Sequence, residues 1–284
     1  MSWSGPSNVS CLAAGAAGYV SQNLRKLGNE IHLVSCIGED LFGEMITISL
    51  KKVGINIGYI QIEKGTEGAI AIFLLLFGDK KRPLTFRLPT HHGWPPKFDK
   101  KNRKYLLNVD LFHSAGYLHF PDLWNTEIID IYKEAKEKGI KTSIDPQFPL
   151  INLPKPWINV LKPFIKYVDI IMIDENEALN ISGKNTIQEA ANFLYNEGLK
   201  TIAIKQGAKG VLVKNELVME QIPAIPPKEF VDSIGAGDSF DAGFLQGLLE
   251  EKDIISAAKM GVKAASLSIE ATGGTESFPF RKDL

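Results

Sequence analysis

The sequence predicts an α/β fold, in which a central and mostly parallel sheet is flanked by helices and carries a small β-sheet lid. Two observations lead to this prediction. Apolar strand-like runs alternate with helical patterns through most of the chain, which is typical of parallel strands joined by helices. The stretch 59–87 departs from the alternation, because its short β-rich pieces leave no room for helices between them.

The first elements are a helix over about 16–26, a strand over 31–37 and a helix over 41–53. Gly28 and Gly54 follow the last apolar residues of the two helices, where a glycine commonly ends a helix. These elements therefore open the main α/β domain.

The lid comprises three short pieces, IQIE, AIAIFLLLF and LTFR, which turn residues separate. We expect them to form an antiparallel sheet that projects from the main body. The main domain would then consist of residues 1–58 and 88–284, with the lid over 59–87 inserted in it.

The alternation resumes after the lid and continues to the C-terminus. The strand-like runs are LFHSAG, IKTSID, DIIMID and KTIAIKQG. Helical patterns cover 125–138 and 187–196 between these runs, and two helices over 236–249 and 253–268 complete the chain. Strands and helices in this order predict one parallel sheet.

Composition narrows the classes of function. With 32 Lys and Arg against 33 Asp and Glu, the chain has a net charge of -1, which does not suit binding to nucleic acid or to a membrane surface. The apolar run 69–77 is about half of what spans a bilayer as a helix. The N-terminus has no signal-peptide pattern, and for Cys11 and Cys36 free thiols are favoured over a disulfide. We therefore expect a cytoplasmic protein.

The segment DSIGAGDSFDAGF carries the candidate chemistry. Gly235, Ala236 and Gly237 allow a sharp turn with exposed N–H groups, directly before a helical pattern. Such a turn binds anions, because the free N–H groups and the helix dipole point at the same place. Asp238 could then take a proton from an attacking hydroxyl while the amides hold a phosphoryl group. A simple helix cap would explain the same aspartate.

This segment resembles the C-terminal signature of the ribokinase, or PfkB-type carbohydrate kinase, family, whose usual form is D-T-x-G-A-G-D-x-F-x-x-G-F. The matching positions are Asp232, Gly235, Ala236, Gly237, Asp238, Phe240, Gly243 and Phe244. The resemblance implies a ribokinase-like fold and transfer of the ATP γ-phosphoryl group to a hydroxyl of a sugar or polyol. Asp238 would be the catalytic base, and Gly235, Ala236 and Gly237 would form the anion hole with it.

Two further family motifs imply a nucleotide site. The Lys-x-Gly-x-x-Gly turn is KQGAKG here, so Lys205, Gly207 and Gly210 would border the nucleotide. Outside this context the same turn is typical of an ordinary hairpin. The terminal stretch AASLSIEATGGTESFP is similar to the loop that borders adenine in the family, which would place Gly273 beside the nucleotide and Val262 against the base.

Metal sites are implied by the same resemblance. The family's Asn-x-x-Glu motif, associated with magnesium and phosphate, corresponds to Asp174 and Glu177. Glu177 matches and would reach Mg²⁺, whereas Asp174 replaces the Asn and would lie near the phosphates. A helix N-terminus favoured by the dipole would explain this acidic pair as well. The family also holds a potassium ion near its terminal loop, to which Asp232 and Ser277 would belong.

The substrate end is less similar to the family. Relatives have a Gly-Gly loop followed by Asn; here Gly15 keeps the second glycine, Ala14 replaces the first and Tyr19 stands at the Asn position. Gly15, Tyr19 and Asp238 are therefore the candidate substrate residues, with packing at a helix start as the alternative for Tyr19. Of the D-x-N-x-R motif only Asp145 is retained, which disfavours a phosphorylated or acidic sugar.

The largest departure is at the N-terminus. Family members begin with a strand whose Asp binds sugar hydroxyls, and MSWSGPSNVSCLAAG contains no such strand. Because that strand would lie inside the sheet, we expect unpaired backbone groups and an open apolar surface beside it. Either the sequence is an N-terminally shortened form, or the first residues compensate.

Three functions stay open. The first is a sugar or polyol kinase, and the second is a nucleoside or vitamin kinase of the same superfamily. The third is a catalytically impaired protein that binds nucleotide, which the altered substrate end motivates. Relatives often pair through the lid, and the apolar run 69–77 offers surface to bury, so the resemblance adds the expectation of a homodimer.

Overall fold

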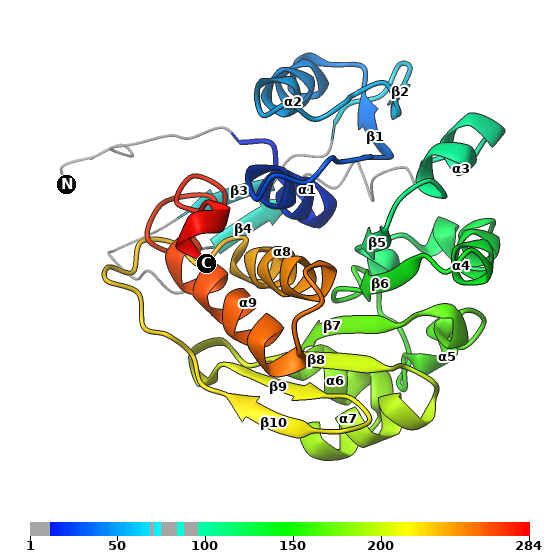
Figure 1. The fold of residues 1–284 in the computed structure, drawn as a ribbon. Helices are drawn as coiled ribbons and strands as arrows, with labels where there is room; N and C mark the ends of the chain where they lie inside the picture. The colour runs from blue at the N-terminus through cyan, green and yellow to red at the C-terminus, as the bar shows by residue number, and fades with distance from the viewer. Residues whose placement is uncertain (1–11, 69–70, 75–83, 88–95) are drawn as a thin grey trace, which may run out of the picture.

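The computed structural model describes residues 12–68, 71–74, 84–87 and 96–284 (Figure 1). Its largest sheet has six strands in the order β10-β9-β8-β7-β6-β5. The strands are β5 (Leu111–Ala115), β6 (Lys141–Asp145), β7 (Ile170–Asp174), β8 (Thr201–Lys205), β9 (Val211–Lys214) and β10 (Met219–Ile222). Strands β5 to β8 are parallel, and β9 and β10 join antiparallel. The predicted central, mostly parallel sheet is confirmed.

Helices cover both faces of this sheet (Figure 1). Ile171 and Ile173 pack into one core, whereas Ile170 and Met172 of the same strand pack into the other. The first core is closed by α4 (Ile128–Glu137), α5 (Ile158–Leu161), α6 (Glu175–Ser182) and α7 (Ile187–Asn196); the second by α8 (Ala236–Leu249) and α9 (Ile254–Ser268). Since successive side chains of a strand point to opposite faces, two covered faces require a continuous apolar run such as IIMI.

Local capping signals determine where several helices begin. Thr186 and Glu189 form a capping box at the start of α7, and the Asp253 side chain accepts the amides of Ile255 and Ser256 at the start of α9. The predicted bounds of α7, α8 and α1 (Ala16–Lys26) agree with the structure. The helix α3 (Lys100–Leu106) was not predicted.

A second, two-stranded sheet pairs β1 (Ser35–Gly38) with β2 (Ile60–Glu63) in parallel. The expectation that IQIE pairs antiparallel with the pieces that follow it is therefore wrong. The physical reason is α2 (Leu41–Lys52), which supplies the long crossover that a parallel pair requires. Strands β3 (Ala71–Leu74) and β4 (Leu84–Arg87) do pair antiparallel, as expected.

The two parallel sheets are not joined. Within the described residues, β5 pairs with β6 alone and β1 with β2 alone. A cavity of about 2000 Å³ is lined by residues of β1, β5 and α1, and it reaches Asp238. Among the described residues, β1 and β5 therefore each have one edge without a strand partner.

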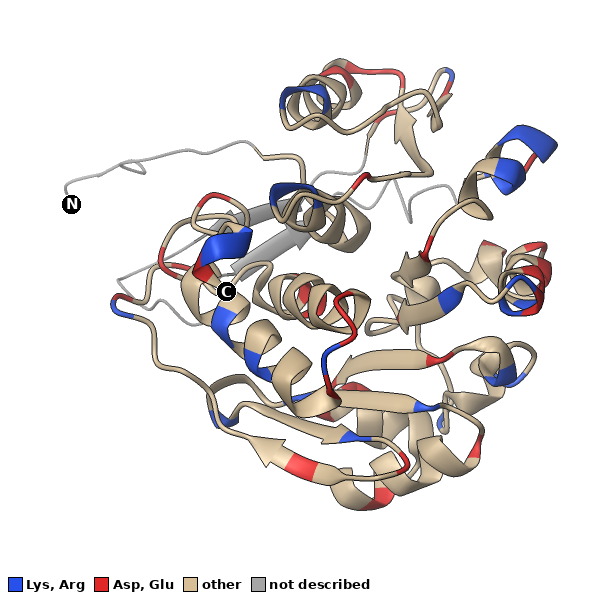
Figure 2. Cartoon of the chain, in the orientation of Figure 1, with Lys and Arg blue, Asp and Glu red and all other residues tan. Residues whose placement is uncertain are grey.

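Charged residues of both signs are distributed over many elements in Figure 2, and α3 has the densest group of basic residues. No described helix is both long and apolar enough to cross a membrane. Cys36 is free, while Cys11 lies outside the described residues. The side chains of the run 69–77 also lie outside them, so the homodimer, the division into main domain and lid and the cytoplasmic location stay predictions.

Candidate active site

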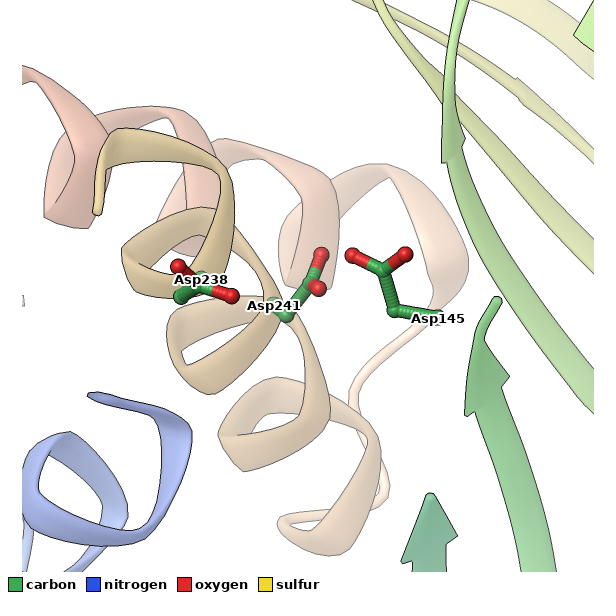
Figure 3. Close-up of side chains that lie close together, drawn as sticks. All are labelled: Asp145, Asp238 and Asp241. Carbon is green, nitrogen blue, oxygen red and sulfur yellow. The ribbon is translucent and has the colours of Figure 1, made fainter. Parts of the chain in front are cut away.

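Several candidate residues converge at the carboxyl ends of the parallel strands. Asp145 ends β6, Asp174 ends β7 and Lys205 ends β8, and Asp174 lies opposite Lys205 in the strand register. This edge of an α/β sheet is where ligands commonly bind. Helix α8 brings Asp238 to the same edge, so that carboxyl oxygens of Asp145, Asp238 and Asp241 lie within 4.8 Å of one another (Figure 3).

The turn before α8 has the geometry expected of an anion site. Gly235 is the N-cap and has a φ of 74°, a left-handed conformation that glycine adopts without strain. Gly237 is an exposed residue whose amide has no hydrogen-bond acceptor among the described residues, whereas the Ala236 amide donates to the Ser233 carbonyl at 3.3 Å. The Gly237 amide is therefore the more available donor for an anion.

Asp238 is half-buried on the cavity wall. Burial, reinforced by the negative charge of Asp145, raises the pKa of Asp238 to about 7, although Lys205 and the backbone amide of Asp238 oppose the shift. A carboxyl group with a pKa near neutral is well suited to accept a proton at neutral pH. The side chain thus has both the access and the proton affinity of a general base.

Gly15 and Tyr19 line the same cavity as Asp238. Gly15 is the N-cap of α1, and the Tyr19 ring stands 3.7 Å from the position of a Cβ on Gly235. Burial, followed by the charges of Asp238 and Asp232, raises the pKa of Tyr19 to about 12. The structure therefore brings the three candidate substrate residues together.

Lys205 has partners that the sequence analysis did not anticipate. Its Nζ donates to Asp145 Oδ2 at 2.8 Å and to Asp241 Oδ1 at 3.0 Å. A direct contact between this ammonium group and the nucleotide stays a prediction, and the two ion pairs do not support it. Opposite charges instead hold the pKa of Lys205 well above its usual value, even though burial opposes this.

Asp241 is a buried residue that the sequence analysis missed. It lies one turn after Asp238 on α8, and its carboxyl group hydrogen bonds to that of Asp145. Burial raises the pKa of Asp241, and Asp145 adds to the rise while Lys205 opposes it. In Asp145 burial is outweighed, because Lys205 and the hydrogen bond with Asp241 lower its pKa. The available signal was an aspartate within the apolar pattern FDAGF.

Asp174 and Glu177 form the capping box of α6. The Glu177 amide donates to Asp174 Oδ1, and the Asp174 amide donates to Glu177 Oε2, each at 2.8 Å. The helix-start explanation is thus confirmed, yet the other oxygen of each carboxyl group has no donor among the described residues. Burial, then the charges of Asp145 and Asp174, raise the pKa of Glu177 to about 8. The second oxygens of the two carboxyl groups are ligands of the kind that magnesium prefers, and a bound cation would favour the charged form of Glu177.

Gly207 and Gly210 shape the hairpin between β8 and β9, with φ angles of 57° and 94°. A Cβ on Gly210 would stand 2.0 Å from the Ile222 carbonyl oxygen, so only glycine fits there. The hairpin lies beside the start of α6, where Lys209 and Glu175 form an ion pair at 3.6 Å. It therefore lies near Asp174 but does not line the cavity, and its contact with a nucleotide stays a prediction.

The terminal loop is tied to the segment before α8. Asp232 is buried, and its Oδ2 accepts the Gly273 amide at 3.0 Å. The Asp232 amide and the Ser277 hydroxyl donate to the consecutive carbonyls of Ile269 and Ser268. Asp232 and Ser277 are therefore attached to the same loop, while a potassium ion there stays a prediction.

The other contacts of this region are structural. Val262 is 6 % exposed and packs in the core between α8 and α9, so contact with adenine stays a prediction. Asn23 Nδ2 donates to Ser239 Oγ at 3.1 Å, and Ser239 Oγ donates to the Gly274 carbonyl at 3.0 Å. These bonds, which the sequence analysis missed, fasten α1, α8 and the terminal loop around Asp238.

Comparisons with known proteins agree with this geometry. The family described as pfkB family carbohydrate kinase matches residues 4–281. A cytidine kinase from Thermococcus kodakarensis is 27% identical over 256 residues, which cover 89% of this chain and 86% of the relative.

Two solved structures share the fold. Arabidopsis thaliana ribokinase complexed with ribose and ATP aligns with a TM-score of 0.80 at 23% identity, covering 95% of this chain and 85% of that one. A putative ribokinase II from E. coli in complex with ATP and Mg²⁺ aligns with a TM-score of 0.76 at 22% identity, covering 95% and 86% of the two chains.

Proposed function

This chain belongs to the pfkB family of carbohydrate kinases, and from that premise we propose that it transfers the γ-phosphoryl group of ATP to a hydroxyl group of a sugar or polyol, with Asp238 as the catalytic base. The observation that carries the proposal is the position of Asp238. It stands in the first turn of α8, on the wall of the cavity and next to the Gly237 amide, for which the described part of the chain offers no acceptor.

In the proposed reaction, the acceptor hydroxyl loses its proton to the Asp238 carboxylate as its oxygen forms a bond to the γ-phosphorus. The bond between that phosphorus and the β,γ-bridging oxygen breaks, and ADP departs with the electron pair. The Gly237 amide and the positive end of the α8 dipole stabilise the charge on the transferring group. Asp238 then releases its proton to solvent.

Magnesium fits the acidic pair at the start of α6. Asp174 and Glu177 would hold the ion through the carboxylate oxygens that the capping box leaves free, directly or through water. When bound, Mg²⁺ neutralises phosphate charge. Asp232 and Ser277 remain the candidate residues for a potassium ion.

A nucleoside acceptor is the second candidate, and Tyr19 favours it. An aromatic ring beside the proposed base offers a face on which a nucleobase can stack, which a small polyol does not need. The similarity to a cytidine kinase supports the same choice.

The test is ATP consumption by the purified chain with a panel of sugars, polyols and nucleosides. Turnover of one acceptor is expected, and Asp238→Asn should lower kcat by about 100-fold or more, since general base catalysis contributes on that order. Asp253→Asn is the matched control, because this aspartate caps α9 away from the site and Asn also caps helices. Full activity of Asp238→Asn would exclude the base assignment. ATP binding without turnover of any acceptor would instead favour a protein that only binds nucleotide.

A further inference from the structure

We propose that Lys205, Asp145 and Asp241 form a positioning device, which holds the first turn of α8 and hence Asp238 against the carboxyl edge of the sheet. The proposal rests on the function proposed above, since it concerns the geometry of the proposed base. Neither Asp145 nor Asp241 is assigned to touch the acceptor or the reacting phosphate, and for Lys205 the proposal concerns only its bonds to these two carboxyl groups.

One ammonium group connects three elements. Lys205 ends β8, Asp145 ends β6 and Asp241 lies on α8, and β7 runs between the two strands. Lys205 Nζ is 2.8 Å from Asp145 Oδ2 and 3.0 and 3.2 Å from the two carboxyl oxygens of Asp241. The side chains of Asp145 and Asp241 are 5% and 0% exposed, so water does not compete for these bonds. In Figure 3 their carboxyl groups point toward each other.

The contact lies directly under the turn that the reaction uses. A Cβ on Gly237 would stand 3.6 Å from Lys205 Nζ, so the ammonium group lies immediately beneath the anion-binding turn. Asp241 follows Asp238 by three residues, which places both on the same face of α8. Fixing Asp241 therefore fixes the direction of Asp238. A misplacement of about 1 Å can cost about 100-fold in rate, so this constraint matters.

The charges of the trio balance if Asp241 keeps its proton. Asp241 would donate that proton to Asp145, and the Asp145 carboxylate would neutralise Lys205. The geometry agrees with this, because both carboxyl groups approach the same ammonium group and point toward each other. An unpaired buried charge would be costly, and this arrangement leaves none.

Among the described residues, the titratable groups around Asp238 come from several elements. They are Asp145 from β6, Lys205 from β8, Asp241 from α8 and Tyr19 from α1, while Glu177 from α6 and His113 from β5 act on the trio. Lys205 is the single cation among them. It therefore opposes the negative charges that raise the pKa of Asp238.

Two substitutions of Asp241 separate positioning from charge. Asp241→Asn keeps the shape, can donate to Asp145 and can accept from Lys205, so kcat should stay within about threefold of wild type. Asp241→Leu removes the hydrogen bonds of this side chain to Lys205 and to Asp145. It should lower kcat by about 100-fold, while the KM for ATP changes by less than about threefold. The proposal would be overturned if kcat fell equally in the two variants, or if it did not fall in Asp241→Leu.

The pH dependence of kcat/KM provides a second test, because a purely structural role of Lys205 would leave it unchanged. Lys205→Met should shift the acid limb of kcat/KM to higher pH, because Lys205 lowers the pKa of Asp238 and the variant removes its charge. Lys136→Met is the matched control: this lysine pairs with Asp169, which precedes β7 at the opposite edge of the sheet. An unshifted limb in Lys205→Met would contradict the proposal, as would an equal shift in the control.

Amide hydrogen exchange tests the device without any catalytic assay. In Asp241→Leu, the amides of residues 239–242 should exchange about tenfold faster or more, while the amides of α9 exchange at the wild-type rate. In Asp241→Asn, all amides should exchange at the wild-type rate. Unchanged exchange at 239–242 in the Leu variant would overturn the proposal even in an active enzyme. Conversely, accelerated exchange in a chain that phosphorylates no acceptor would support the device and refute the proposed function.

Discussion

Lys205 Nζ and Asp241 Oδ1 lie 3.0 Å apart, although 36 residues separate them in the sequence. This hydrogen bond joins the carboxyl end of β8 to the helix that carries Asp238. Because both side chains are buried, it affects the free energy of unfolding as well as the geometry of the candidate site.

Loss of Lys205 should destabilise the fold strongly. Lys205→Met leaves Asp145 without its cation in a buried setting, and removal of one partner of a buried pair costs about 3–5 kcal/mol. Urea unfolding measures the difference. The double variant Lys205→Met with Asp145→Asn should be more stable than Lys205→Met alone, since it removes the orphaned charge. A double variant that is less stable than the single one would contradict this explanation.

Activity should depend on pH through Asp238. The pKa of this carboxyl group is raised to about 7, and only the deprotonated form accepts a proton. We therefore expect kcat/KM to rise by about tenfold per pH unit below that value and to level off above it. A pH–rate profile with the identified acceptor measures this. A plateau that extends down to pH 5 would show that another group is the base.

Asp238→Asn should stabilise the fold while it removes activity. The folded-state pKa of Asp238 lies above the ordinary value of 3.8, so the folded chain binds the proton more tightly than the unfolded chain. Stability contributed by this group is thus lost as pH rises from about 4 to about 7. Asn does not titrate, so the stability difference between Asp238→Asn and wild type should grow across this window. Unfolding curves at pH 4 and pH 8 test the sign, and a difference that shrinks with pH would contradict it.

Gly235→Ala should weaken both stability and activity. The φ of 74° costs an L-residue about 1 kcal/mol, and the new Cβ would stand 3.2 Å from the Cα of Gly274. Gly139→Ala is the matched control, because Gly139 has a φ of 73° and no atom within 4 Å of its Cβ position. Thermal unfolding should show a lower Tm in both variants, whereas kcat should fall only in Gly235→Ala. A loss of kcat in the control would assign the effect to stability alone.

Tyr19 should act on the acceptor and not on ATP. Tyr19→Ala removes a ring from the cavity wall and should raise the KM of the acceptor by about tenfold, since a lost aromatic contact is worth about 1 kcal/mol or more. The KM for ATP should stay unchanged. Tyr19→Phe keeps the ring and should behave like wild type if stacking is its role. A KM change for ATP alone would place Tyr19 outside the acceptor site.

The fold was predictable where its signals are local. The strands that carry IKTSID and DIIMID, and the helices over 187–196 and 236–249, follow from apolar patterns and stop signals within a few residues of each other. The pairing of β2 with β1 was not predictable in this way, because it depends on how α2 returns the chain.

In the candidate site, the GAGD turn, the helix that follows it and the place of Asp238 in the first turn could be predicted from the sequence alone. These features depend on the small size of glycine and on the first turn of one helix, which are properties of adjacent residues. The partners of Lys205, in contrast, depend on how distant segments of the chain pack together. A lysine at the end of a strand can reach a nucleotide or a carboxylate with equal ease. Because α8 packs on the sheet, two buried carboxyl groups lie within 3.0 Å of that ammonium group and become its partners.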